Sequence, residues 1–165
     1  MRAPLIVVLL ALAGAPAVTT AQTVVQEPNA TFYPHLGVQG SVGQDVNLGL
    51  GVRYENRMLG MFPEAPNLRF ATSFDYFFPD SPLSYWELNG DVFNLFAWNG
   101  ARIVPYLGGG INVARQSAGP AHHTDVGVNL VGGARLPGRY RPYLEGRVEL
   151  GGGNRFVLTL GWLIW

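Results

Sequence analysis

Apolar and polar residues alternate with a period of two from about Thr31 to the end of the chain, and turn-forming residues interrupt the alternation every ten to fifteen positions. This pattern is typical of short strands joined by tight turns, and no segment of useful length has the period of a helix. The sequence therefore predicts an all-β, antiparallel up-and-down barrel of eight strands, at 32–42, 45–56, 67–78, 85–97, 101–115, 124–136, 140–150 and 155–165.

The turns are predicted from residues that break strands. Asn99-Gly100 is the strongest hairpin signal among them. The other breakers are Gly43, Pro63 with Pro66, Asp80 to Pro82, Gly119-Pro120, Pro137-Gly138 and Gly151 to Asn154.

One face of the predicted strands carries no charged residue. It includes Val46, Leu48, Leu50, Val52 and Tyr54, then Phe70, Thr72, Phe74, Tyr76 and Phe78, then Trp86 to Trp98, Ile103 to Val113, Val126 to Ala134 and Pro142 to Leu150 at alternate positions. The other face holds the charges, interleaved with Gly, Asn and Gln: Asp45, Arg53, Glu55, Arg69, Asp75, Glu87, Asp91, Arg102, Asp125, Arg135, Arg141, Glu145, Arg147 and Glu149.

Periodicity alone does not say which face is inside. A soluble lipocalin-like barrel would hide the apolar face, whereas a barrel in a membrane would expose it to lipid. Many glycines and small amides lie between the charges, and this suits the narrow interior of an eight-stranded barrel. Aromatic residues gather near the strand ends, as in the girdles of membrane barrels. The balance favours a transmembrane β-barrel with a polar, side-chain-filled lumen.

The amino-terminal segment has the features of a cleaved secretory signal. Arg2 supplies a positive charge, Leu5 to Ala13 is apolar, and small residues precede a cut after Ala21, with Ala17 as the alternative. The apolar run is too short to span a bilayer as a helix, which needs about 20 residues. We therefore expect a signal peptide at 1–21, a short periplasmic leader at 22–30 and the barrel domain at 31–165.

Charge and cysteine content exclude several classes of protein. Eleven basic residues balance eleven acidic ones, so the net charge gives no reason to expect nucleic-acid binding. The chain has no Cys, which excludes a disulfide scaffold, a thiolate nucleophile and a Cys-ligated metal.

The last strand, Arg155 to Trp165, ends on an aromatic residue, and Pro105 to Gly110 and Arg141 to Glu145 form similar strand segments. Here the chain resembles the small eight-stranded outer-membrane barrels of the OmpA/OmpX type over nearly its whole mature length. The resemblance implies that the outer-membrane insertion machinery recognises the strand ending at Trp165. It also implies a lipid-facing set of Val157, Thr159, Gly161, Leu163 and Trp165.

Two features depart from that family. Phe156, Leu158, Leu160, Trp162 and Ile164 are apolar as well, so the last strand has two apolar faces. The predicted outer connections are short, and the longest connection, 57–66, falls on the periplasmic side.

Three groups of residues are candidates for chemistry. Glu145 and Glu149 could suggest the carboxylate pair of a glycosidase, but residues four apart on a strand lie about 13 Å from each other, which is too far. An ion-pair ladder with Arg53, Arg69, Arg135 and Arg141 explains them better. His122-His123, placed in a connection near Asp125, is a weak metal motif, and His35 is expected to form hydrogen bonds in the lumen.

The sequence thus predicts a monomeric, non-enzymatic outer-membrane barrel with a structural or surface-interaction role. Its predicted partners are outer-membrane lipid and the insertion machinery, and we expect no cofactor, metal or nucleic acid. The alternative is a soluble secreted or periplasmic lipocalin-like barrel that binds an apolar ligand. A lipid-modifying enzyme would require His35 or His122 beside a Ser and a carboxylate.

Overall fold

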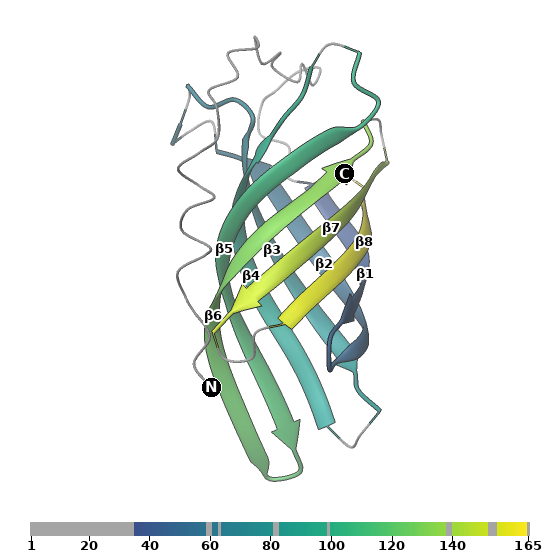
Figure 1. The fold of residues 1–165 in the computed structure, drawn as a ribbon, viewed down its shortest axis with the longest axis vertical. Coiled ribbons are helices and arrows are strands. Elements are labelled where there is room, and N and C mark those ends of the chain that lie inside the picture. The colour runs from purple at the N-terminus through teal and green to yellow at the C-terminus, as the bar shows by residue number, and fades with distance from the viewer. Residues whose placement is uncertain are drawn as a thin grey trace, which may run out of the picture.

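Eight strands, each antiparallel to its neighbours, close into a barrel in the computed structural model of the chain (Figure 1). The structure describes residues 35–58, 61–62, 64–80, 83–98, 100–137, 140–151 and 155–164. The strands are β1 (His35–Gly43), β2 (Asn47–Arg57), β3 (Leu68–Phe78), β4 (Leu83–Leu95), β5 (Val104–Ala118), β6 (Ala121–Arg135), β7 (Arg141–Leu150) and β8 (Arg155–Leu163).

Every strand pairs with the next one in sequence, and β1 pairs with β8 to close the sheet, from Gly37 opposite Leu163 to Gly43 opposite Val157. The predicted all-β, eight-stranded, up-and-down barrel is therefore confirmed. The expected signal peptide at 1–21, the leader at 22–30, Pro63, Pro82, Asn99, Gly138 and Trp165 lie outside the described residues.

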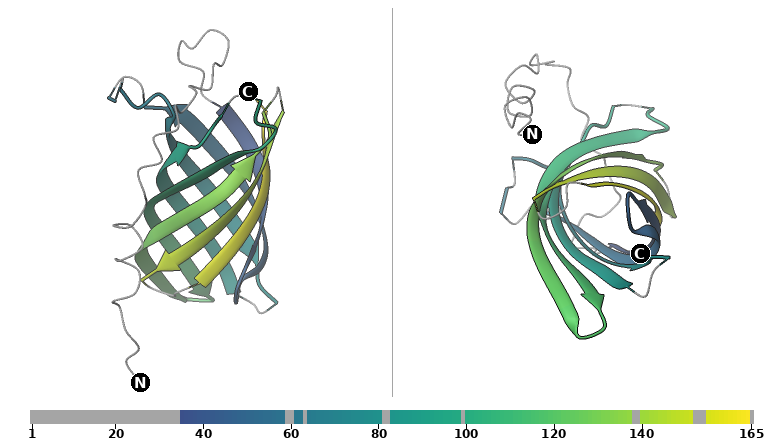
Figure 2. Two further views of the ribbon diagram at one scale, coloured as in Figure 1. Left: turned by 45° about the horizontal axis from the view of Figure 1, so that its top comes forward. Right: turned by 60° about the horizontal axis from the view of Figure 1, so that its bottom comes forward.

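The hairpin of β5 and β6 is longer than the sequence predicted, and it extends past the other strands at one end of the barrel (Figures 1 and 2). Gly119 takes a left-handed conformation with φ of 57°, so that a tight turn lets the pairing run to Ala118 opposite Ala121. The pairing of β6 with β7 begins only at Val128, so residues 121–127 project beyond β7. We call residues 115–125 the protruding hairpin.

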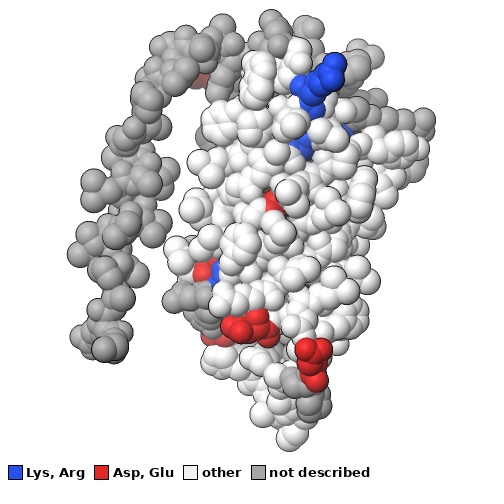
Figure 3. Space-filling model, turned by 45° about the vertical axis from the view of Figure 1, so that its right-hand side comes forward, with Lys and Arg blue, Asp and Glu red and all other residues white. Residues whose placement is uncertain are grey.

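The two faces of the barrel differ as the alternation predicted. Outward positions expose large apolar side chains along every strand, among them Leu50, Phe74, Leu88, Ile111, Val128, Leu144 and Leu160. On the face drawn in Figure 3, most of the surface is uncharged, and the larger charged patches lie toward the two ends. The buried charged side chains point into the barrel: Arg53, Glu55, Arg69, Asp75, Glu87, Asp91, Arg135, Glu145, Arg147 and Glu149.

The orientation predicted for the last strand is wrong. Val157, Thr159, Gly161 and Leu163 point inward, whereas Phe156, Leu158, Leu160, Trp162 and Ile164 point outward and are exposed. The reason is register: Thr159 lies directly opposite Ser41 of β1 and Glu145 of β7, and residues in direct opposition share a face. Both of those neighbours face the polar interior, so Thr159 must do the same.

Four positions near strand ends also differ from the prediction. Val46, expected outside, is buried, whereas Asp45 and Asn47, expected inside, are exposed. Residues 44–46 form a turn, and Asp45 and Asn47 have φ of 68° and 58°, so the period of two does not hold there. Arg102 is exposed because β5 begins only at Val104.

Candidate functional site

The barrel interior contains a continuous set of buried ion pairs, which we call the interior network. Its members come from five strands, β2, β4, β6, β7 and β8, and their side chains meet because they all point into the narrow barrel interior. They are Arg53, Glu55, Glu87, Asp91, Arg135, Glu145, Arg147, Glu149 and Arg155.

Arg53 and Glu145 form the central pair. Arg53 Nη1 donates to Glu145 Oε2 at 2.8 Å, although the two residues are 92 positions apart in sequence. The Tyr106 hydroxyl donates to the same oxygen at 3.0 Å. The Arg53 guanidinium also lies over the ring of Tyr143, 4.9 Å from its centroid. Toward β6, Arg135 Nη1 donates to Glu55 Oε1 at 2.6 Å, which extends the network.

Arg147 and Arg155 neutralise the carboxylates nearer the turn between β1 and β2. Arg147 lies 3.2 Å from Glu145 and 3.9–4.0 Å from Glu87, Asp91 and Glu149. Arg155 lies 3.4 Å from Glu87 and 3.6 Å from Glu149, and it packs over the ring of Tyr85, whose hydroxyl donates to Glu87. Each of these charges thus has an oppositely charged group within 4.0 Å, which is the condition for tolerating it in a narrow interior.

Asp75 is held by neutral groups. Gln39 Nε2 donates to both of its oxygens, at 2.7 and 2.8 Å, and the Ser41 hydroxyl donates to one of them at 3.1 Å. The Tyr143 hydroxyl donates to Gln39 Oε1 at 2.5 Å, and Ser41 shares a hydrogen bond of 3.0 Å with Thr159. These bonds connect β8, β1, β3 and β7 across the interior.

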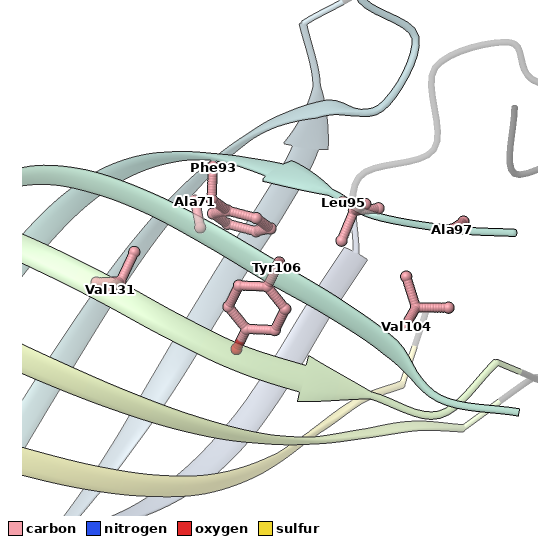
Figure 4. Close-up of a cluster of buried hydrophobic side chains, with 7 residues drawn as sticks. All are labelled: Ala71, Phe93, Leu95, Ala97, Val104, Tyr106 and Val131. Carbon is pink, nitrogen blue, oxygen red and sulfur yellow. The ribbon is translucent and has the colours of Figure 1, made fainter. Parts of the chain in front are cut away.

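Buried apolar residues flank the polar residues on both sides. One cluster consists of Ala71, Phe93, Leu95, Ala97, Val104, Tyr106 and Val131, with the Phe93 and Tyr106 ring centroids 4.9 Å apart (Figure 4). At the turn between β1 and β2, a second cluster contains Val46, Phe77, Tyr85, Ala114 and Val157. The interior is therefore filled by side chains at several levels.

Inward glycines provide the room that the aromatic side chains need. A Cβ atom at Gly161 would lie 2.4 Å from the Tyr143 ring, and one at Gly133 would lie 2.6 Å from the Tyr106 ring. A Cβ atom at Gly108 would lie 2.4 Å from Phe93 Cβ. Close packing against rings thus explains Gly133 and Gly161, whereas Gly51 and Gly110 make room for the side chains of Asp75 and Asp91 and for neighbouring backbone.

A pocket of about 400 Å³ opens at the end of the barrel that carries the protruding hairpin. We call this end the mouth. Tyr85 and Arg155 connect the pocket with the interior network, and the remaining lining comes from two turns and three strand ends: Asp45, Val46, Asn47, Pro79, Asp80, Leu83 and Gln116.

The candidate residues identified from sequence occupy different places. Glu145 and Glu149 belong to the interior network, and Arg53 and Arg135 take part in it as predicted. Of the other two predicted arginines, Arg69 donates to the carbonyl oxygens of Pro66 and Leu68, at 2.8 and 3.1 Å, and Arg141 lies beside His35. His35, on the inward face of β1, lies 2.7 Å from Arg141 Nη1, which fits its expected hydrogen-bonding role. His122 and His123 lie in β6 rather than in a connection, and His123 Nε2 is 2.9 Å from Asp125 Oδ1.

Sequence reasoning missed the role of Arg155. The incorrect orientation of the last strand would have turned this side chain outward, and the correct register brings it against Glu87 and Glu149. The inward tyrosines Tyr85, Tyr106 and Tyr143 were also missed. The sequence carried a signal for two of them, because Tyr143 lies at an alternate position between Arg141 and Glu145, and Tyr85 lies two residues before Glu87.

Within the described part of the chain, no group of three or more His, Asp or Glu side chains could hold a metal ion. None of the described residues forms a helix long and apolar enough to cross a membrane.

Comparison with known proteins gives similarity in structure only. No family model and no curated protein matches the chain. The N-terminal β-barrel domain of Pseudomonas aeruginosa OprF superimposes with a TM-score of 0.53 at 13% identity, covering 78% of this chain and 94% of that domain. The chain shares the fold of that domain.

Ail, the attachment invasion locus protein of Yersinia pestis, aligns with a TM-score of 0.47 at 14% identity, covering 78% of this chain and 92% of Ail. The structure of Ail with the heparin analogue sucrose octasulfate gives the same values. At such identities the similarity is one of fold, and what this chain does must be argued from its own residues.

Proposed function

We propose that the chain is an integral protein of the bacterial outer membrane, a non-enzymatic β-barrel with a structural or surface-interaction role. The observation that carries this proposal is the inverted arrangement of the barrel, with charges buried inside and large apolar side chains exposed outside. In water the exposed apolar surface would be unfavourable, since soluble proteins rarely show large contiguous apolar patches. In lipid the same surface is favourable, and a closed barrel leaves no strand edge unpaired.

The height of the apolar band fits a bilayer. Trp86 and Phe96 both point outward from β4 or its end, and they are ten residues apart. At about 3.3 Å per residue and a strand tilt of about 40°, they are separated by roughly 25 Å along the barrel axis. This equals the height of the apolar band in transmembrane barrels, about 25 Å.

Aromatic side chains border the band at both ends. Tyr76, Phe78 and Trp86 point outward near the mouth, and Phe96 and Trp98 point outward near the opposite end. Trp and Tyr prefer the interface between lipid and water because their rings are apolar and carry one polar group. The two groups are therefore the expected anchors of a barrel that spans the membrane.

The soluble alternative requires the opposite arrangement. A lipocalin-like carrier would line its cavity with the apolar face, but here that face is outside and the interior contains paired charges and packed rings. A wide channel is not proposed either, since eight strands enclose only enough space for side chains.

We propose no catalytic role. Glu145 is held by Arg53 and Arg147 rather than poised beside a second free carboxylate. Ser117 lies directly opposite His122, but Asp125 points to the other side of the hairpin, so these three do not form a triad.

Export and assembly complete the proposal. Residues 1–21 serve as the cleaved signal, 22–30 as the periplasmic leader, and the strand ending at Trp165 as the element that the insertion machinery recognises. The protein is a monomer in the membrane, because the pairing of β1 with β8 closes the barrel wall, and β6 extends past its neighbour β7 only in the protruding hairpin, outside the wall.

Cell fractionation tests the proposal. The full chain, produced in a Gram-negative host, should remain in the outer-membrane pellet after washing with urea and should be released by detergent. A variant lacking residues 1–21 is the control and should not leave the cytoplasm. Recovery of the full chain from the periplasm without detergent would overturn the membrane assignment.

A further inference from the structure

The two sides of the protruding hairpin differ in charge. In an antiparallel sheet, residues in direct opposition point to the same side, and successive residues alternate between sides. Trp86, Arg115 and Thr124 are in direct opposition across β4, β5 and β6, as are Ser84, Ser117 and His122. The four hairpin residues, together with Ser84 and Trp86 of the adjoining start of β4, form what we call the outward side of the hairpin, which continues the surface that carries Ile111 and Val126.

The other side faces the mouth and carries the acidic groups. Tyr85, Gln116 and His123 are in direct opposition there, and Asp125 lies one step further along β6, paired with His123. The mouth pocket beside Gln116 adds Asp45 and Asp80. Among the described residues of the hairpin, the carboxylate therefore lies on the mouth side and the arginine on the outward side.

Arg115 lies at the level of the aromatic girdle. It is directly opposite Trp86, whose ring marks the depth at which lipid headgroups begin. Its guanidinium forms no hydrogen bond or ion pair with another described residue. A long Arg side chain at this depth extends its charge toward the headgroups while its methylene groups cover apolar surface.

We propose that the outward side of the protruding hairpin binds the phosphate groups of membrane lipid headgroups, with Arg115 as the main cation. Ser84, Ser117, His122 and Thr124 supply further hydrogen-bonding groups around it. The inference rests on the proposed membrane location. Bilayer lipid is the occupant because the outward side continues the apolar band without interruption, and its charge is complementary to phosphate.

The geometry also orients the hairpin. With the cation toward the headgroups and the carboxylates toward the mouth, the hairpin stands upright at the rim of the barrel. An Arg near an anionic membrane surface contributes about 1 kcal/mol to the free energy of binding to that surface, which is roughly a fivefold change in the equilibrium constant. This sets the size of the effect to be measured.

The test exchanges two neighbouring residues. Arg115→Gln combined with Gln116→Arg keeps composition and net charge, but it moves the guanidinium from the outward side to the mouth side. Gln116 is exposed, so the exchange buries no new charge. The unfolding equilibrium in urea is measured in maltoside micelles with and without added phosphatidylglycerol, and diacylglycerol, which lacks the phosphate, serves as the lipid control.

Phosphatidylglycerol should lower the unfolding equilibrium constant of the wild-type chain about fivefold more than that of the exchanged variant. Diacylglycerol should change the two constants equally. Arg115→Gln alone, which keeps the mouth side unchanged, should behave like the exchanged variant. Equal stabilisation of all three proteins would overturn the proposal, since the effect would then come from bulk charge. Equal stabilisation of the wild type by inorganic phosphate alone would overturn the assignment to lipid.

Insertion into phosphatidylcholine vesicles, measured separately, distinguishes this proposal from the one on which it rests. A wild-type chain that inserts but shows no preference for phosphatidylglycerol over diacylglycerol would contradict the headgroup site alone. Failure to insert would contradict the membrane location itself.

Discussion

The central ion pair offers the most direct test of how the interior stabilises the barrel. Arg53→Met removes the group that donates to Glu145 at 2.8 Å, but Arg147 at 3.2 Å and the Tyr106 hydroxyl at 3.0 Å remain. Breaking a buried pair from one side costs about 3–5 kcal/mol, because a charge is left without its partner. The remaining contacts place this variant near the lower limit, at about 3 kcal/mol.

Glu145→Leu should be worse. It leaves Arg53 with Glu55 at 3.9 Å as its remaining ion-pair partner, and Arg147 with carboxylates at 3.9–4.0 Å. We expect a loss of about 4–5 kcal/mol. The double variant removes both charges and should cost roughly 4 kcal/mol, so the coupling energy between the two residues should be about 3–4 kcal/mol.

The assay is urea unfolding in detergent micelles, followed by tryptophan fluorescence and by the mobility of unheated samples on denaturing gels. Leu50→Met, on the outward face, is the matched control and should change stability by no more than about 0.5 kcal/mol. Single variants that each cost less than about 1 kcal/mol, or losses that simply add in the double variant, would refute the view that these charges depend on each other.

Three further outcomes are expected. In bilayers, Val92→Arg at the middle of the apolar band should cost about 2–4 kcal/mol in unfolding free energy, and Ser84→Arg near the girdle about 0–1 kcal/mol; equal costs would argue against a lipid-facing band. Gly161→Val should prevent the Tyr143 ring from occupying its site and should lower the yield of folded barrel, measured by gel mobility; an unchanged yield would mean that the ring can move. Val46→Asp places a charge among buried apolar side chains and should destabilise the barrel by about 2–3 kcal/mol in urea titrations, whereas a neutral result would mean that the turn opens freely.

The strands could be predicted from sequence because two independent signals agree. Alternation determines which residues share a face, and Gly, Pro, Asn and Asp mark the turns. In β3, β4 and β7 both signals are clear, and the outward and inward sets predicted there match the structure. The charged residues of these strands all lie on one face. A charged side chain among Phe and Leu side chains on the other face would have no partner, and this would cost too much free energy.

The last strand shows where alternation stops being informative. With apolar residues on both faces, hydrophobicity gives no phase, and only the register against Ser41 and Glu145 decides that Thr159 points inward. Register depends on pairing between distant segments, which a single sequence does not display. The same error placed Arg155 on the outward face. Its place in the interior network became clear only once the structure showed which face of the last strand points inward.

Turns set the second limit. The inward-folded Val46 and the extension of β5 and β6 to Ala118 and Ala121 both depend on left-handed backbone conformations at single residues. Asp, Asn and Gly adopt such conformations at modest cost, as Asp45, Asn47 and Gly119 do here. The sequence alone does not say at which Asp, Asn or Gly the backbone will take this conformation. The signal at 1–21 and the role of Trp165 stay predictions.

The pairing of β1 with β8 also has a kinetic consequence. It joins Gly37 to Leu163, so the sheet cannot close until almost the whole described chain has been made and ordered. Contacts this distant in sequence are slow to form, because the entropy of closing the loop is lost before any pairing is gained. Arg53 and Glu145 lie on opposite parts of the same sheet and become neighbours only when it curls. Closure and charge neutralisation should therefore occur in one cooperative late step, and an open sheet should persist until that step.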